Sequence, residues 1–295
     1  MKTNDQTIHI LNAELLDSDG KTRLTNATIT GSQFIETTGH ANLEDGSTVI
    51  DAKGNLLIPG LHDHHTHLIA YAASLVSINC GPPDVASEAD LKSALRGQPG
   101  RHWLRGTGYH ESVSGHLDRQ WLDTWAPDRP IRIQHRSGRL WILNSPGMEM
   151  IANAALSLAP HERDRLTSED GRLYDVDELL GKLTRSDVPP VRLASQQLAA
   201  FGVTGINDMT PSNNPETWQW FSELQVSQDL LQKVRMSGRP ALFGCKQTPR
   251  LSVGETKVHL HDSSLPDFDD FVSTITDSHE KQRNVAVHCV TEVEL

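Results

Sequence analysis

The chain has 295 residues, of which 37% are hydrophobic and 22% are charged, and its formal net charge is −11. This length and composition support one large packed domain, or one large and one small domain, and exclude an intrinsically disordered protein. The acidic balance disfavours nucleic acids and anionic membranes as partners.

Three cysteines, Cys80, Cys245 and Cys289, lie far apart and form no paired spacing. Their pattern disfavours a disulfide framework or a cysteine zinc site and fits a reducing compartment. The first twenty residues lack the apolar run of a signal peptide, and the longest apolar stretch, residues 68–78, is too short to span a bilayer. We therefore expect a cytoplasmic protein, with residues 68–78 as a buried helix.

Residues 1–58 are expected to form an N-terminal β element, because short runs of β-branched residues alternate with turn signals such as Asp19-Gly20. From residue 59 onward, short strands alternate with helices, which is typical of parallel β/α units. The sequence predicts strands at 203–207, 232–236, 257–260 and 285–288, and helices at 191–201, 215–224 and 266–279.

Residues 80–190 do not fit a single β/α unit. A helix is predicted at 89–95, where Ser87 and Asp90 have capping-box spacing, and strands are predicted at 103–105 and 131–133. Ser145-Pro146 is expected to begin a second helix as its N-cap and first residue, and 161–171 is expected to be a loop. We interpret the segment as an insertion that shapes a pocket.

His65 and His67 follow an apolar run, so they are expected near the C-terminal end of a strand, where active sites of β/α barrels lie. Residues i and i+2 of a strand share a face, and two imidazoles placed in this way can bind one metal ion. Asp63 has the same parity and is expected to support the ligands. The alternative is a polar loop with chance histidines, since such a pair alone is a weak motif.

Two later strands also carry candidate groups. Alternation places Lys257 and His259 on one face of their strand, and an inward lysine is costly unless it has a function. The alternative is a lysine whose ammonium reaches solvent. Residues 285–287 predict a buried parallel strand that ends at His288. A histidine satisfied in the core is the alternative there.

The sequence resembles the amidohydrolase superfamily and, within it, the amidohydrolase-3 group. The matching pieces are Pro59-Gly60, Asp63, His65 and His67 of the first barrel strand, the lead-in at 49–54, the insertion pieces at 103–109 and 143–145, and residues 202–204 of the second strand. The resemblance implies an α/β fold, an incomplete (β/α)8 TIM-like barrel of the metal-dependent hydrolases with an N-terminal β-sandwich element. By the same resemblance, residues 1–58 would belong to the sandwich and 59–295 to the barrel, with the insertion at about 80–190.

The implied activity is hydrolysis of a non-peptide C–N bond in an amide-like small molecule by metal-activated water. One or two divalent ions, expected to be zinc, would be held by His65, His67, Lys257 and His288. In many members a lysine at the position of Lys257 is carboxylated and bridges two metals. His259 would contact the substrate.

The family pattern continues with a strand-six histidine and with a strand-eight aspartate that takes a proton from the attacking water. The sequence ends at Leu295, soon after His288, so we expect a C-terminally truncated member whose catalytic base is unknown. The alternative is a truncated, catalytically inactive fragment that still binds metal. Arg139 also departs from the family, since many relatives carry histidine there. The sequence is compatible with a homo-oligomer. It contains no nucleophile elbow of a serine hydrolase and no phosphate-binding glycine loop.

Overall fold

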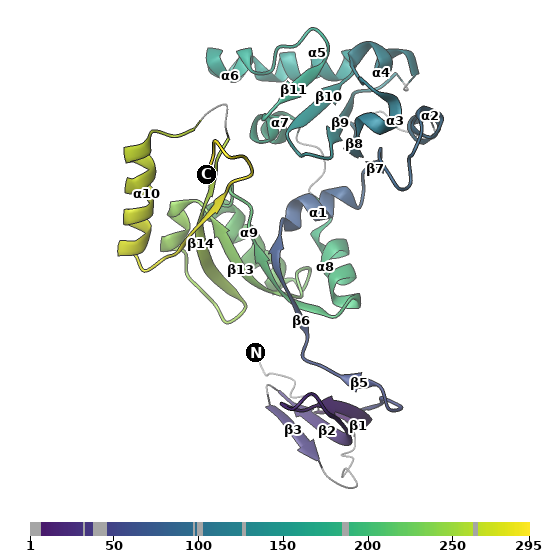
Figure 1. The fold of residues 1–295 in the computed structure, drawn as a ribbon, viewed down its shortest axis with the longest axis vertical. Coiled ribbons are helices and arrows are strands. Elements are labelled where there is room, and N and C mark those ends of the chain that lie inside the picture. The colour runs from purple at the N-terminus through teal and green to yellow at the C-terminus, as the bar shows by residue number, and fades with distance from the viewer. Residues whose placement is uncertain are drawn as a thin grey trace. The chain divides into compact units, whose positions relative to one another are not determined.

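The computed structural model describes residues 7–31, 33–37, 46–96, 98, 103–125, 128–184, 189–261 and 265–295. Contacts divide the chain into two compact units, Met1–Leu61 and His62–Leu295. Figure 1 shows the first unit in purple and the second from blue to yellow. Within the described residues, no helix has the length and hydropathy that crossing a membrane requires.

The first unit is a mixed sheet with strand order β3-β2-β1-β4, in which β5 also pairs with β1. Its strands are β1 (Thr7–Leu16), β2 (Thr22–Thr30), β3 (Gln33–Thr37), β4 (Thr48–Asp51) and β5 (Leu56–Leu57). Ile10, Ala13 and Ala27 form its small buried core. The described residues of this unit make one sheet, and the second layer of a sandwich stays a prediction.

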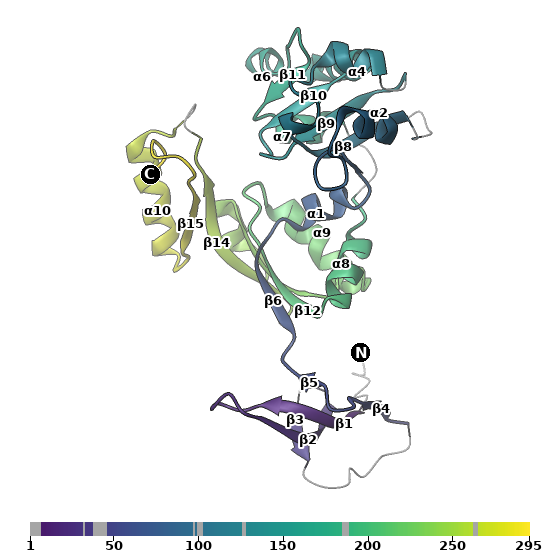
Figure 2. The same ribbon diagram turned by 45° about the vertical axis from the view of Figure 1, so that its right-hand side comes forward.

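The second unit contains a curled sheet with strand order β15-β14-β13-β12-β6, which forms half of a barrel (Figure 2). The strands are β6 (Leu61–Thr66), β12 (Val203–Asp208), β13 (Lys233–Gly238), β14 (Leu251–His259) and β15 (Val285–His288). Pairing from β12 through β15 is parallel throughout. The alternation of strands and helices in the sequence therefore predicted the fold class correctly.

Apolar side chains on one face of this half-barrel pack against helices. Ile206, Val234 and Met236 belong to a buried cluster that also contains Leu68 of α1 and Phe221 of α9. The helices are α1 (Leu68–Ser74), α8 (Val191–Ala200), α9 (Pro215–Val226) and α10 (Phe268–Glu280). We call the opposite face of the sheet the inner face, and alternation places polar residues such as Asn207 and Arg235 on it.

Strand β14 is longer than the sequence predicted, because it begins at Leu251 rather than at residue 257. Ser252, Gly254 and Glu255 interrupt the apolar pattern in its first half, and such residues normally argue against a strand. Here Glu255 bonds the neighbouring strand: its carboxylate accepts hydrogen bonds from Arg235 (2.9 Å) and Ser237 (2.7 Å). Polar partners on the inner face thus replace apolar packing.

One arginine connects the loop before β15 to the two strands beside it. The Arg283 side chain is buried, with an exposed fraction of 6%. Its guanidinium donates to backbone carbonyls of Gly254 (2.6 Å), Glu255 (2.7 Å), Arg239 (3.0 Å), Gly238 (3.3 Å) and Pro240 (3.4 Å). Burial lowers the pKa of this guanidinium, and Glu255 opposes that effect.

The segment between α1 and α8 forms a second sheet, of order β11-β10-β9-β8-β7, with its own buried clusters. Its strands are β7 (Ile78–Asn79), β8 (Leu104–Tyr109), β9 (Ile131–His135), β10 (Leu140–Leu143) and β11 (Arg172–Tyr174). Its helices are α2 (Glu88–Arg96), α3 (Glu111–Ser114), α4 (Arg119–Trp125), α5 (Ser145–Ala154), α6 (Pro160–Asp164) and α7 (Asp177–Leu183), and η1 (Ala155–Ser157) is a short 3-10 turn.

Two local predictions for this insertion were wrong. Asn144, not Ser145, is the N-cap of α5: its side chain accepts a hydrogen bond from the Gly147 amide at 3.0 Å. Pro160 begins the short helix α6 inside the expected loop, since its ring pre-sets a helical φ and Glu162 accepts a hydrogen bond from the Ala159 amide. The predicted capping box of α2 is confirmed, with Ser87 and Asp90 bonding each other's amides.

Candidate metal centre

The two histidines of the sequence motif lie where β6 ends. His65 is in the strand, and His67 is the N-cap of α1 with φ −121° and ψ 83°. Their ring centroids are 5.5 Å apart. Asp63 turns back onto the backbone, where its carboxylate accepts a hydrogen bond from the His65 amide at 2.9 Å. Its contact is therefore with the main chain that carries the histidines.

A buried aspartate that the sequence reasoning overlooked organises the next turn of chain. Asp208, the last residue of β12, is fully buried and accepts hydrogen bonds from the amides of Leu68 (2.9 Å) and Thr210 (3.0 Å). The Asn213 amide group adds a third at 2.9 Å. Thr210 in turn places its hydroxyl 3.1 Å from His67 Nδ1. An acidic residue directly after a predicted parallel strand was the available signal.

Lys257 and His288 come from the two strands farthest from β6 in the sheet order. Parallel register pairs Lys257 with Ala286 and His259 with His288. Lys257 is buried, with an exposed fraction of 8%. Burial lowers the pKa of its ammonium, with Glu255 acting in the opposite direction. A lowered pKa favours the neutral amine, which is the form that can react with carbon dioxide.

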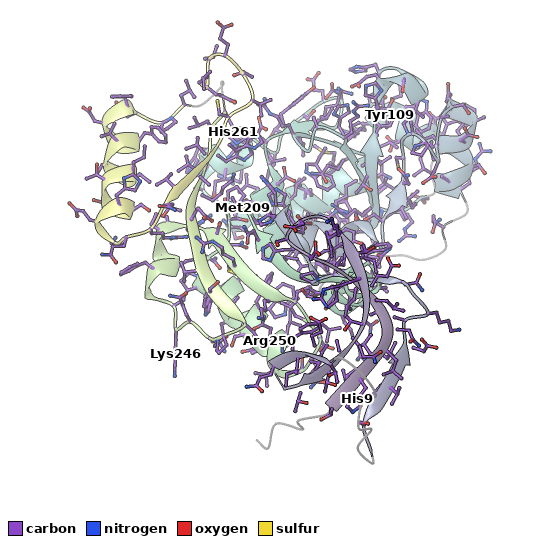
Figure 3. The ribbon with its side chains drawn as sticks, turned by 60° about the horizontal axis from the view of Figure 1, so that its bottom comes forward. His9, Tyr109, Met209, Lys246, Arg250 and His261 are labelled. Atoms are coloured by element: carbon purple, nitrogen blue, oxygen red, sulfur yellow. The ribbon has the colours of Figure 1, made fainter. Side chains whose placement is uncertain are left out.

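Three imidazoles gather at the C-terminal ends of β14 and β15. The ring of His259 lies 4.1 Å from that of His261 and 4.5 Å from that of His288, centroid to centroid. Burial, followed by the neighbouring His261 and His288, lowers the pKa of His259 to about 4. Figure 3 labels His261 at this end of β14. Rings with lowered pKa values are neutral near pH 7, as metal binding or hydrogen bonding to a neutral substrate requires.

The motif histidines and the distal strands influence one another electrostatically. Burial lowers the pKa of His67, Asp208 opposes this, and His65, Lys257 and His288 lower it further. Burial likewise lowers the pKa of His288, with Lys257 and His65 among the further causes. Across the described ranges, no group of three or more His, Cys, Asp or Glu side chains is already arranged to hold a metal. The donor types nevertheless fit a divalent ion, since neutral imidazoles and a neutral amine offer lone pairs.

The insertion contributes an ion pair that lies near His261. Arg139 donates two hydrogen bonds to the Asp175 carboxylate, at 2.9 and 2.8 Å, in a bidentate pair. These bonds lower the pKa of Asp175 although burial acts to raise it, and His261 and His259 add to the lowering. His261 Nδ1 lies 4.0 Å from Asp175. Arg239 and Glu178 form a second ion pair between the half-barrel and the insertion.

A parallel half-barrel with imidazoles and a buried lysine at the carboxyl ends of its strands has the layout of a β/α-barrel active site. The chain belongs to the amidohydrolase family, whose model, described as "Amidohydrolase family", matches residues 48–292.

One curated relative and two solved structures are similar to this chain, and the solved structures share its fold. An N-substituted formamide deformylase of Arthrobacter pascens is 24% identical over 232 residues, which cover 70% of this chain and 43% of the relative. A metal-dependent hydrolase of Pyrococcus horikoshii OT3 matches 98% of this chain and 66% of its own with a TM-score of 0.72 at 16% identity. Its Pyrococcus furiosus counterpart gives 0.66 at 18% identity, over 98% of this chain and 68% of its own. The chain thus spans less than half the length of the deformylase.

Proposed function

We propose that this half-barrel is the metal-binding part of a hydrolase that cleaves a non-peptide C–N bond in an amide-like small molecule. His65, His67, Lys257 and His288 are the proposed ligands of one or two zinc ions. One observation carries the proposal: a buried lysine and these three histidines lie at the carboxyl ends of strands in a single curled sheet. This end of the sheet is where barrel enzymes place their chemistry.

Each residue has a defined task in this proposal. A divalent metal bound here would polarise a carbonyl group and lower the pKa of a water molecule. Asp208 fixes the start of α1 and thereby the backbone that follows His67. Carboxylation of Lys257 would replace a buried amine by an anionic oxygen donor. His259, the last residue of β14, is proposed to hydrogen-bond the substrate as a neutral imidazole.

N-substituted formamides are the first substrates to test, because the curated relative is named a deformylase of such compounds. An amide of this kind has one carbonyl oxygen to be polarised and one nitrogen to leave. Asp175 lies 4.0 Å from His261 and is bonded to Arg139, so both charges are proposed to border the substrate. This part of the pocket is expected to select among the nitrogen substituents.

Metal content provides the direct test. Purified protein is expected to carry zinc or another transition metal, measured by inductively coupled plasma mass spectrometry after dialysis. The double variant His65→Ala/His67→Ala is expected to lose most of it. The matched control is His116→Ala/His161→Ala, which removes two exposed histidines of the insertion. Equal metal in all three proteins would remove the site assignment.

Turnover provides the second test. Hydrolysis of N-substituted formamides, followed by release of formate, is expected to need the metal, so chelation should stop it and zinc should restore it. Lys257→Met is expected to lower any turnover at least tenfold, because no carbamate can form on it. Turnover that survives both chelation and this substitution would contradict metal-dependent hydrolysis at the proposed ligands.

A further inference from the structure

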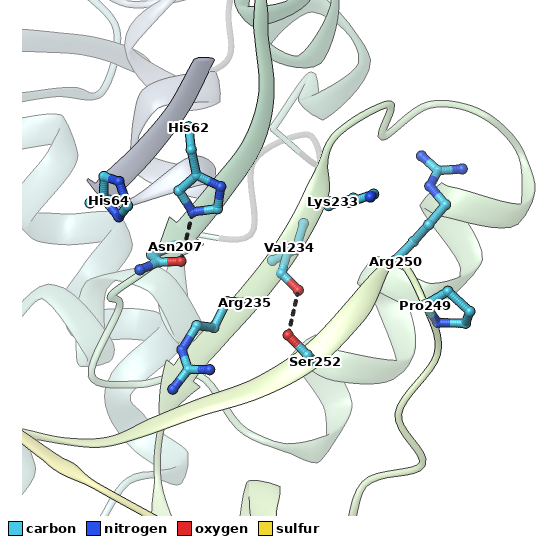
Figure 4. A pocket seen from close by; sticks show the side chains of 9 residues that line it. All are labelled: His62, His64, Asn207, Lys233, Val234, Arg235, Pro249, Arg250 and Ser252. Carbon is cyan, nitrogen blue, oxygen red and sulfur yellow. Dashed lines mark hydrogen bonds between the residues drawn. The ribbon is translucent and has the colours of Figure 1, made fainter. Parts of the chain in front are cut away.

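The described residues line an open cavity of about 400 Å³ that does not coincide with the candidate metal centre (Figure 4). It opens on the inner face of the half-barrel and extends to the ends at which β13 and β14 begin. Lys233 is the first residue of β13, and Arg250 directly precedes β14. The other side is formed by His62 and His64 of β6 and by Asn207 of β12.

The lining of this cavity is cationic and contains no carboxylate. Three of its side chains are the cations Lys233, Arg235 and Arg250. Glu255, which lies outside the lining, neutralises Arg235 through their ion pair at 2.9 Å. In the described part of the chain, Lys233 and Arg250 have no carboxylate within ion-pair distance. Two unneutralised cations beside one cavity, in a protein of net charge −11, indicate an anionic ligand.

The polar groups around the cavity are held in place by the fold. The Nη2 atom of Arg250 donates to the carbonyl oxygens of Leu230 and Leu231, both at 2.8 Å, which fixes the guanidinium and leaves its Nε and Nη1 groups as donors. His62 Nε2 lies 2.9 Å from the amide oxygen of Asn207. That bond occupies the oxygen of Asn207 and leaves its amide nitrogen as a donor for a ligand.

A glycine makes room for this arrangement. Gly205 pairs with Lys233 in the sheet, and a Cβ atom at this position would lie 2.4 Å from His62 Nδ1. Any other residue would therefore displace the His62 imidazole from its present position. The space over Gly205 is filled by a polar ring that lines the cavity, where a barrel interior would normally hold apolar side chains.

We propose that this cavity binds a phosphate-bearing small molecule. Two unneutralised cations match a dianion, whereas a monocarboxylate would balance only one of them. The Nε and Nη1 groups of the fixed Arg250 remain as charged donors that a phosphate oxygen can accept from. The volume corresponds to roughly a dozen water molecules at ~30 Å³ each, so it exceeds one phosphate and fits a phosphate ester or pyrophosphate. The proposal does not depend on metal binding at the other end of the strands.

Isothermal titration calorimetry of the whole chain with inorganic phosphate and with pyrophosphate tests this site. Pyrophosphate is expected to bind saturably and more tightly than phosphate. Lys233→Gln is expected to weaken it at least tenfold, since one of two cations is lost. Lys246→Gln is the matched control, because Lys246 is exposed, lies outside the lining and projects outward in Figure 3. Its affinity is expected to equal that of the unchanged protein.

The Lys233 side chain is exposed and makes no hydrogen bond or ion pair to another described residue, so its substitution separates binding from folding. Equal circular dichroism spectra and melting temperatures of both variants would verify this separation. Raising sodium chloride from about 20 to about 200 mM should weaken the binding, because exposed charges are screened. No saturable binding of either anion below about 10 mM would overturn the proposal. Equal losses in Lys233→Gln and Lys246→Gln would overturn it too, since they would indicate a general charge effect.

Discussion

Replacing Arg283 by methionine is expected to loosen the half-barrel more than any exposed substitution. The guanidinium is buried and satisfies carbonyl oxygens of β14 and of the chain after β13, three of them within 3.0 Å. A hydrogen bond from a charged donor contributes roughly 1.5–3 kcal/mol, and such terms are not additive within one network. Methionine fills much of the volume but leaves these carbonyls without a donor. We expect a loss of about 3–5 kcal/mol.

Hydrogen exchange measured by mass spectrometry localises this effect. Peptides that cover β14 and β15 should exchange about a hundred- to several-thousandfold faster in Arg283→Met, since every 1.4 kcal/mol is tenfold. Peptides from the insertion, which has its own core, should change little. Arg192→Gln is the control, because this arginine is 72% exposed and its ion pair with Asp229 is 3.7 Å long. Exchange in β14 that accelerates less than about tenfold would refute the assigned role of the guanidinium.

Two further substitutions test the polar framework of the sheet. Asp208→Asn is expected to lower the free energy of unfolding in urea by about 1–3 kcal/mol. The reason is that the new amide group places a donor against one of the three N–H groups that Asp208 accepts from. The control Asp164→Asn, at an exposed aspartate, should change the free energy of unfolding little. Hydrogen bonds from Arg235 and Ser237 outweigh burial and lower the pKa of Glu255 to about 2. Its folded-state pKa thus lies below the unfolded value, so its stabilisation is complete above about pH 4.5 and is lost as the pH falls toward 2. The stability difference between the protein and Glu255→Gln should therefore shrink from on the order of 1–3 kcal/mol at pH 6 to near zero at pH 2, and a constant difference would contradict this origin.

Local chemistry made much of the fold predictable from the sequence. The strand at Val285–His288 was predicted to the residue, because three apolar residues end at a histidine. The helix at Val191–Ala200 was also predicted, since an amphipathic run ends before Gly202. Both signals are contained within a few neighbouring residues, where periodicity and turn chemistry decide the conformation.

The first half of β14 and the role of Asp208 could not be predicted in the same way, because their partners lie far away in the sequence. Glu255 is stable in a strand only because Arg235 and Ser237 face it from β13. Asp208 is buried only because Leu68, 140 residues earlier, offers it an amide. Polar residues carry no periodic pattern, so their burial depends on tertiary pairing that the sequence leaves unstated.

The polar character of the inner face also explains why the candidate metal ligands could be predicted from the sequence, whereas the cationic cavity could not. His65, His67, Lys257 and His288 follow apolar runs or alternate with them, so sequence reasoning can assign each of them to a strand. Lys233, Arg250 and Gly205 stand at strand starts or on the inner face, where a charge is ordinarily solvated and a glycine ordinarily marks a turn. The fold brings these residues together. Parallel register pairs Gly205 with Lys233, and Arg250 lies beside Lys233 in the lining of the cationic cavity. If that cavity binds phosphate compounds, the two ends of the same strands bind different ligands. Substitutions at Lys233 should then leave the metal content unchanged. Conversely, His65→Ala/His67→Ala should leave the affinity for pyrophosphate unchanged.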